Sequence, residues 1–155
     1  MRRVVRQRAD KKVGRREERR NLMAQEAEIR EELRRLRARL PHATGALAAG
    51  VDGMVLAQEA DTVEAEGVAA LTAAALGVGL RLTDTASHGP FRELLVRGEQ
   101  GYVAIYAAGT ACVLTVLAGP QVNVGRLHME ARRSGAHIAH LVDGDPEPRE
   151  DAPTP

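Results

Sequence analysis

The sequence GVAALTAAALGVGL fills residues 67–80, and Thr72 is its only polar side chain. At 100° per residue, a helix over residues 63–82 carries two separate apolar stripes. A helix on a protein surface needs only one apolar face, so this helix is predicted to be covered on two sides. The first stripe holds Val68, Leu71, Ala75, Val78 and Leu82, and the second holds Ala69, Ala73, Leu76 and Leu80.

We expect one side of this helix to pack on a sheet of its own chain and the other side to pack on a second protein. The apolar run of 14 residues is shorter than the roughly 20 residues that a membrane span needs. Its Ala and Gly residues let another backbone approach closely, which favours helix against helix. We therefore predict oligomerisation through this helix. The alternative is a central helix in a larger single core, for which a chain of 155 residues has little left to supply.

Five short apolar runs separated by turn residues predict the strands around this helix. Val51-Asp52-Gly53 joins the first two runs, because Asp-Gly favours the positive φ of tight hairpins. Short turns that contain Gly join the last three runs into an antiparallel meander. The predicted strands are Thr44–Ala49, Met54–Gln58, Phe91–Arg97, Tyr102–Ala107 and Thr110–Leu117.

Further helices are predicted before and after the strands. From Ala24 to Leu40, apolar residues recur at helical steps, and Pro41 ends the helix. The last helix runs from Asn123, a plausible N-cap, to Leu141. The order is helix, two strands, helix, three strands, helix. It predicts an α+β fold in which a five-stranded antiparallel sheet is sandwiched between helices.

Charge divides the chain into three regions, although its 22 basic and 21 acidic side chains nearly balance. Residues 1–22 are predicted to be a disordered basic leader, with ten Arg or Lys and three acids in the first 20. Residues 23–142 form the folded domain, and residues 143–155 a disordered tail rich in acids and Pro. A purine-rich stretch of the ribosome-binding type can encode Arg16-Glu17-Glu18, so we hypothesise that translation starts at Met23.

Few residues in this chain carry chemistry. Cys112 is the only cysteine, which excludes an intramolecular disulfide and, without a signal-peptide pattern, points to the cytoplasm. His137 and His140 are spaced i,i+3 but have no third ligand at a fixed spacing, so we expect no metal and no cofactor. No nucleophile stands beside a base, and no Gly-rich phosphate loop is present. The chain is predicted not to be an enzyme.

From Leu33 to Leu141 the sequence resembles the Roadblock/dynein-light-chain superfamily, in particular its actinobacterial members. The motifs that carry the resemblance follow one another in order along about 110 residues. They are Leu36-Arg37-Ala38-Arg39-Leu40-Pro41 leading into Thr44-Gly45-Ala46-Leu47-Ala48-Ala49, the hairpin from Val51 to Ala57, Val68-Ala69-Ala70-Leu71, Gly101-Tyr102-Val103-Ala104-Ile105-Tyr106, Leu114-Thr115-Val116-Leu117, and Asn123-Val124-Gly125-Arg126-Leu127-His128-Met129-Glu130.

This resemblance implies a roadblock/profilin-like fold and a non-catalytic function. Family members form dimers in which the second helices pack together and the third strands meet, and they bind small Ras-like GTPases as scaffolds or activators. Actinobacterial members also work beside a sensor kinase-like protein. The resemblance implies that the GTPase partner binds at Glu64, Glu66 and Arg81. It also implies a homodimer interface formed by Leu71, Ala74, Ala75, Val78, Phe91, Glu93 and Leu95.

Two other functions remain open from the sequence. Sandwiches of this kind can enclose a ligand, as PAS-like and GAF-like sensor domains do, although the strands offer mostly Ala, Val and Leu. The basic leader can bind nucleic acid through phosphate contacts. It has no aromatic residues for base stacking, so nucleic acid is the less favoured partner.

Overall fold

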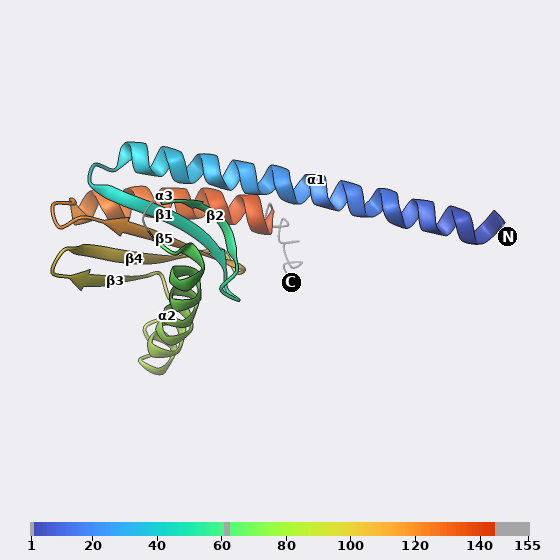
Figure 1. The fold of residues 1–155 in the computed structure, drawn as a ribbon. Helices are drawn as coiled ribbons and strands as arrows, with labels where there is room; N and C mark the ends of the chain where they lie inside the picture. Colours follow the sequence, from blue (N-terminus) through green and yellow to red (C-terminus); the bar gives the residue numbers. More distant parts are fainter. Residues whose placement is uncertain (1, 61–62, 145–155) are drawn as a thin grey trace, which may run out of the picture.

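The computed structural model describes residues 2–60 and 63–144 of the 155. The chain forms a five-stranded sheet, and Figure 1 shows the helices α1 and α3 on one face of this sheet and α2 on the other. The predicted α+β fold and its element order are confirmed. The elements are α1 (Arg2–Arg39), β1 (Ala43–Gly50), β2 (Val55–Glu59), α2 (Ala65–Thr85), β3 (Glu93–Gly98), β4 (Gly101–Ala108), β5 (Cys112–Ala118) and α3 (Val124–Asp143).

The sheet has the strand order β2-β1-β5-β4-β3, and every neighbouring pair is antiparallel. β5 is its central strand and is buried along most of its length. The predicted hairpin between β1 and β2 is present, with Gly53 at φ 85° and the Asp52 carboxylate accepting from the Met54 amide at 3.1 Å. β3 lies at one edge of the sheet, where β4 is its only partner among the described strands.

The larger part of the core lies between the sheet and the pair α1 and α3. The predicted α1 stripe of Ile29, Leu33, Leu36 and Leu40 is at most 1% exposed. From α3, Leu127, Ala131 and Ile138 fill the same layer. Asn123 caps α3 as predicted, because its side chain accepts from the Arg126 amide at 2.9 Å. A smaller core on the opposite face lies under α2.

The first helix differs from the prediction. α1 begins at Arg2, whereas the sequence predicts a disordered leader through residue 22 and a helix from Ala24. The physical reason is composition: the leader has no Pro, and Arg, Lys, Gln and Glu are good helix formers even without an apolar face. The start of translation at Met23 stays a prediction. The predicted tail lies outside the described residues from residue 145 onward.

Candidate interaction surface

The helix α2 has one face on the sheet. Its buried residues are Ala69, Thr72, Leu76 and Gly79, at a helical spacing. Thr72, the one polar side chain of the apolar run, is satisfied locally because its hydroxyl donates to the Ala69 carbonyl at 3.1 Å. The second predicted stripe therefore faces the sheet in its first half, whereas Leu80 at its end is 48% exposed.

Three residues of the other predicted stripe of α2 are uncovered, whereas Val68 packs against the smaller core. Leu71, Val78 and Leu82 are 72%, 60% and 64% exposed, although burial of such side chains is favourable by about 1.5–3 kcal/mol each. Ala74 lies among them and is exposed, while Ala75 is half-buried and packs against the smaller core. We call Leu71, Ala74, Val78 and Leu82 the α2 outer face. Exposed apolar stripes of this kind mark interaction sites.

By length and composition alone, α2 is the one helix in the described part of the chain that could cross a membrane. This differs from the prediction, because the structure extends the helix to 21 residues and 22% of its most apolar window is buried. A core helix of a soluble domain passes the same test. Since Ala69, Thr72, Leu76 and Gly79 pack on the sheet of the same chain, we interpret α2 as a core helix with one uncovered side.

The edge strand β3 alternates its side chains between the two faces of the sheet. Leu94 packs on the α2 side, and Val96, two residues on, is 47% exposed beside it. Glu93 and Leu95 face the opposite side, where Glu93 pairs with Arg132 of α3 and Leu95 packs against the larger core. Of the residues predicted for an interface, Glu93 and Leu95 therefore present only their backbone to the open edge.

Phe91 also has a different place from the one the sequence suggests. It precedes β3, is 8% exposed, and its ring packs under α2 against Gly79. A strand that begins at Phe91 puts residues 91, 93 and 95 on one face. Because β3 begins only at Glu93, that alternation does not extend back to Phe91. The exposed or α2-facing residues left out of the expected interface are Leu82, which the first predicted stripe includes, and Leu94 and Val96 of β3.

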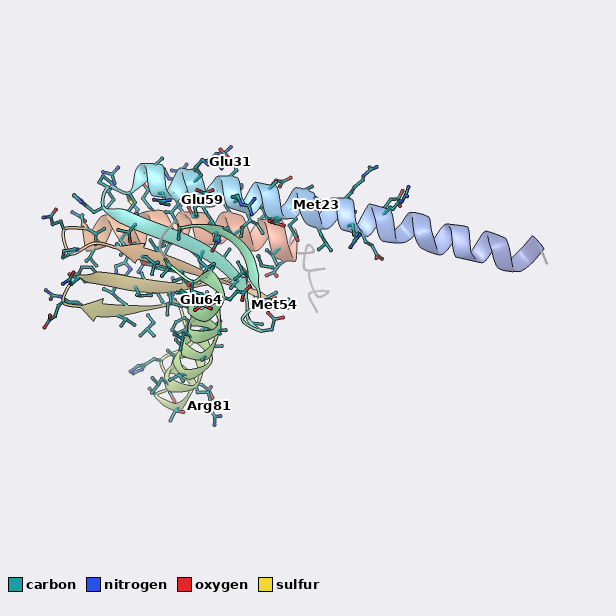
Figure 2. The ribbon with its side chains drawn as sticks, in the orientation of Figure 1. Met23, Glu31, Met54, Glu59, Glu64 and Arg81 are labelled. Atoms are coloured by element: carbon teal, nitrogen blue, oxygen red, sulfur yellow. The ribbon has the colours of Figure 1, made fainter. Side chains whose placement is uncertain are left out.

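The three charged residues predicted for a partner lie at the two ends of α2. Figure 2 shows Glu64 at the start of the helix and Arg81 near its end. Both residues and Glu66 are exposed. Between residues 64 and 81 the helix rises about 26 Å. They therefore form two charged ends around the apolar outer face instead of one cluster.

A polar network, also missed from the sequence, holds α1 to α3. Arg39 donates to Glu32 at 3.0 Å, to Glu130 at 2.7 Å and to Ser134 at 2.8 Å. The Ser134 hydroxyl in turn donates to Glu32 at 2.6 Å. Burial alone would raise the pKa of Glu32, but the hydrogen bonds from Ser134 and Arg39 outweigh it and lower that pKa. The network is structural, since both carboxylates are almost fully buried and mutually paired through Arg39.

A hollow of about 260 Å³ lies between α3 and the β3–β4 edge. Its polar groups largely satisfy one another. The Tyr106 hydroxyl lies 2.8 Å from Nδ1 of His128, and Arg132 donates from Nε to Glu93 at 3.2 Å. The hydrogen bonds from Arg132 lower the pKa of Glu93, while burial raises that of Tyr106. A sensor pocket needs convergent polar groups free for a ligand, so the hollow gives the sensor alternative little support.

Metal ligands and thiol chemistry have little basis in the described residues. Across residues 2–60 and 63–144, no three His, Cys, Asp or Glu side chains are grouped so that they could hold a metal ion. Cys112 is fully buried in β5, and burial raises its pKa to about 11.

The class of protein follows from this sheet, its helices and the uncovered α2. The family model for the Roadblock/LC7 domain matches residues 29–118, more than half of the chain. The chain therefore belongs to the Roadblock/LC7 family, and the resemblance found in the sequence is confirmed.

Relatives and solved structures agree with this assignment. The uncharacterized proteins MJ1340 and MJ0310 of Methanocaldococcus jannaschii are each 30% identical over 95 residues, which covers 61% of this chain and 82% of theirs. The Roadblock/LC7 domain from Streptomyces avermitilis has a TM-score of 0.67 at 24% identity, covering 70% of this chain and 92% of its own. The gliding protein MglB from Thermus thermophilus has a TM-score of 0.72 at 19% identity, covering 79% and 93%. At these identities the two structures support the fold.

Proposed function

We propose that this chain is a homodimeric, non-catalytic regulator or scaffold that binds a small Ras-like GTPase and modulates its GTP hydrolysis. The observation that carries the proposal is the α2 outer face, where Leu71, Val78 and Leu82 are 60–72% exposed. We further expect a cytoplasmic protein that works beside a sensor kinase-like partner, as in the actinobacterial systems that the sequence resembles.

A second copy of the chain suits this face. Two-fold symmetry brings the same patch together from both protomers, so a patch must complement itself. Ala74 lies among the larger apolar side chains of the outer face and lets two helices approach closely. Val96 belongs to the edge strand β3, whose open edge supplies backbone groups that a second strand could pair with. A solved MglB of the same fold is described with a tetrameric arrangement, which supports assembly within this fold.

We propose a GTPase as the partner because members of the superfamily bind Ras-like GTPases on the side of the second helix. The charged ends of α2 are consistent with this. Glu64 and Glu66 at one end and Arg81 at the other lie outside the apolar outer face that the proposed dimer covers. They are therefore the charged residues of α2 that we assign to a second partner.

The dimer is tested by sedimentation equilibrium. We expect the wild-type chain to have twice the mass of one chain, and Ala74→Arg to have the mass of one, because the variant places an unpaired cation in the interface. The control is Met129→Arg, which adds the same charge at a side chain 61% exposed on α3 and is expected to stay dimeric. A monomeric wild type, or a dimeric Ala74→Arg with native circular dichroism, contradicts the proposal.

The GTPase is tested in two steps. Mass spectrometry of proteins captured by the tagged chain, once with GTP and once with GDP in the buffer, identifies a Ras-like GTPase bound in one nucleotide state. Single-turnover hydrolysis by that purified GTPase is then measured with wild type, Glu66→Lys and the control Glu99→Lys. We expect Glu66→Lys alone to weaken binding. Equal binding by both variants contradicts the assigned surface, and unchanged hydrolysis with intact binding leaves a scaffold.

A further inference from the structure

The N-terminal part of α1 extends past the rest of the molecule. Figure 1 shows the helix continuing well beyond the sheet and α3 toward its N-terminus. Ile29 is the first buried residue of α1 in the described chain, and Leu22 and Met23 are 63% and 71% exposed. We call residues 2–24 the overhang. Most helical stability in proteins comes from packing of an apolar face, and residues 16–24 of the overhang are exposed.

The overhang also carries unfavourable charge. It holds ten Arg or Lys and only three acids. Several of the cations are four residues apart, among them Arg16 and Arg20, and like charges at that spacing destabilise a helix. Arg16, Arg19 and Arg20 are exposed, with no acid from the rest of the described domain against them. A negatively charged partner would offset this repulsion.

The chain contains such a partner next to the overhang. Residues 145–155 hold four acids and one Arg, a net charge of −3. The preceding residue, Gly144, caps α3, and the end of α3 is fixed to α1 where Gln25 donates to the Leu141 carbonyl at 2.7 Å. α3 thus ends beside α1 at the point where the overhang begins, as Figure 1 shows.

The lengths of the two segments also match. The overhang of 23 residues spans about 35 Å at the rise of an α-helix. The 11 residues of the tail include four Pro, a composition that favours the extended polyproline conformation and a reach of about 34 Å. Because α3 runs toward the overhang, the tail does not need to turn back to follow it.

We propose that the acidic tail, residues 145–155, docks along the basic overhang of α1 in the same chain. The tether favours this occupant, because a short flexible link gives an effective concentration in the millimolar range. A nucleic acid or an anionic membrane must then compete with the tail for the same cations. The tail therefore screens the overhang from indiscriminate polyanion binding.

Paramagnetic relaxation in the full-length chain tests this directly. Cys112 is the single cysteine of the sequence and is fully buried. The variant Ala152→Cys therefore adds one accessible thiol, which a nitroxide label modifies selectively. In low salt we expect amide signals of residues 2–20 to lose about half of their intensity or more relative to the reduced label. The loss should disappear at about 0.5 M NaCl, where screening is strong.

Charge variants show whether the tail acids are responsible. Glu150→Gln with Asp151→Asn lowers the tail charge from −3 to −1 and should restore the signals. Asp84→Asn with Glu99→Gln removes the same two types of charge from exposed sites elsewhere and should leave the attenuation unchanged. An equal effect of both double variants overturns the proposal.

Two further outcomes identify other occupants. Attenuation in an isotope-labelled chain mixed with a separate spin-labelled chain means that the tail docks on a second copy, which overturns docking within one chain. Absence of attenuation in low salt, while a DNA duplex or an anionic phospholipid vesicle shifts the amides of residues 2–20, means that the overhang binds an external polyanion. Either result is independent of the proposed GTPase.

Discussion

Gly79 leaves room for the ring of Phe91, because a Cβ at position 79 would overlap Cε2 and Cδ2 of that ring. Gly79 lies on the buried side of α2, and Phe91 is 8% exposed in the connection before β3. This contact fixes how closely α2 approaches the sheet. Gly79 therefore allows the buried side of α2, with Ala69, Thr72 and Leu76, to lie against the sheet.

Gly79→Ala should lower the free energy of unfolding by about 1–3 kcal/mol, the usual cost of overpacking a core. Gly77→Ala is the matched variant, because a Cβ at that position meets no atom within 4 Å. It should raise stability by up to about 1 kcal/mol, since Ala is the better helix former. Urea unfolding of both variants measures the difference. Equal shifts for the two would show that Phe91 yields to the new methyl group.

The network around Arg39 predicts a dependence of stability on pH. The folded-state pKa of Glu32 is lower than its ordinary value of 4.5. The stabilising contribution of Glu32 is therefore complete above that value and is lost as the pH falls through the folded-state pKa. Glu32→Gln removes this contribution and should cost about 2 kcal/mol at pH 7, the size of a hydrogen bond to a charged group.

Unfolding curves of wild type and Glu32→Gln should therefore converge as the pH is lowered below 4.5. The control is Glu26→Gln, which removes a carboxylate from an exposed pair with Arg30 on the same helix. It should change stability by less than about 1 kcal/mol at any pH. A constant difference between wild type and Glu32→Gln from pH 7 to pH 3 would contradict the assignment.

The fold could be predicted because its signals are local and periodic. The α1 stripe at Ile29, Leu33, Leu36 and Leu40 is buried as its spacing indicates. The two stripes of α2 separate only in part, because Leu80 of the sheet-facing stripe is 48% exposed and Ala75 of the outer stripe packs against the smaller core. The observed strand bounds differ from the predicted bounds by a residue or two. The difference matters at Phe91, because β3 begins only at Glu93 and the Glu93 and Leu95 side chains therefore do not share a face with Phe91.

The polar network and the overhang could not be predicted for a different reason. Arg39 and Glu130 are 91 residues apart, and nothing local distinguishes Arg39 from the other Arg residues of α1. In the overhang, high charge suggested disorder while the helix propensities of the same residues favoured a helix. The network depends on partners that are distant in sequence, which periodicity does not register, whereas the overhang required a choice between two opposing local signals.

The thiol of Cys112 should react only when the protein opens. Cys112 is fully buried, and burial raises its pKa to about 11, so little thiolate is present at pH 8. We expect a disulfide reagent to label the native chain at least about a hundredfold more slowly than the urea-unfolded chain. Fast labelling of native protein would show that β5 opens locally. Gly79→Ala, if it destabilises the fold globally, should accelerate labelling, and Gly77→Ala should not.

The two faces of β3 predict opposite effects for neighbouring substitutions. Val96 is 47% exposed on the α2 side, so Val96→Asp should weaken the proposed dimer at least about tenfold while leaving the monomer fold intact. Leu95 packs against the larger core, so Leu95→Asp should instead lower the free energy of unfolding by about 1–3 kcal/mol. Sedimentation equilibrium and urea unfolding of each variant separate the two effects.

Val51→Asp is the matched control for Val96→Asp, because Val51 is 49% exposed in the hairpin between β1 and β2. It makes the same chemical change at nearly the same exposure and should leave the dimer dissociation constant unchanged. If Val51→Asp weakens the dimer as much as Val96→Asp, then added negative charge, and not position, is responsible. If Leu95→Asp dissociates the dimer without destabilising the fold, the interface includes the α3 side of β3, where Leu95 lies.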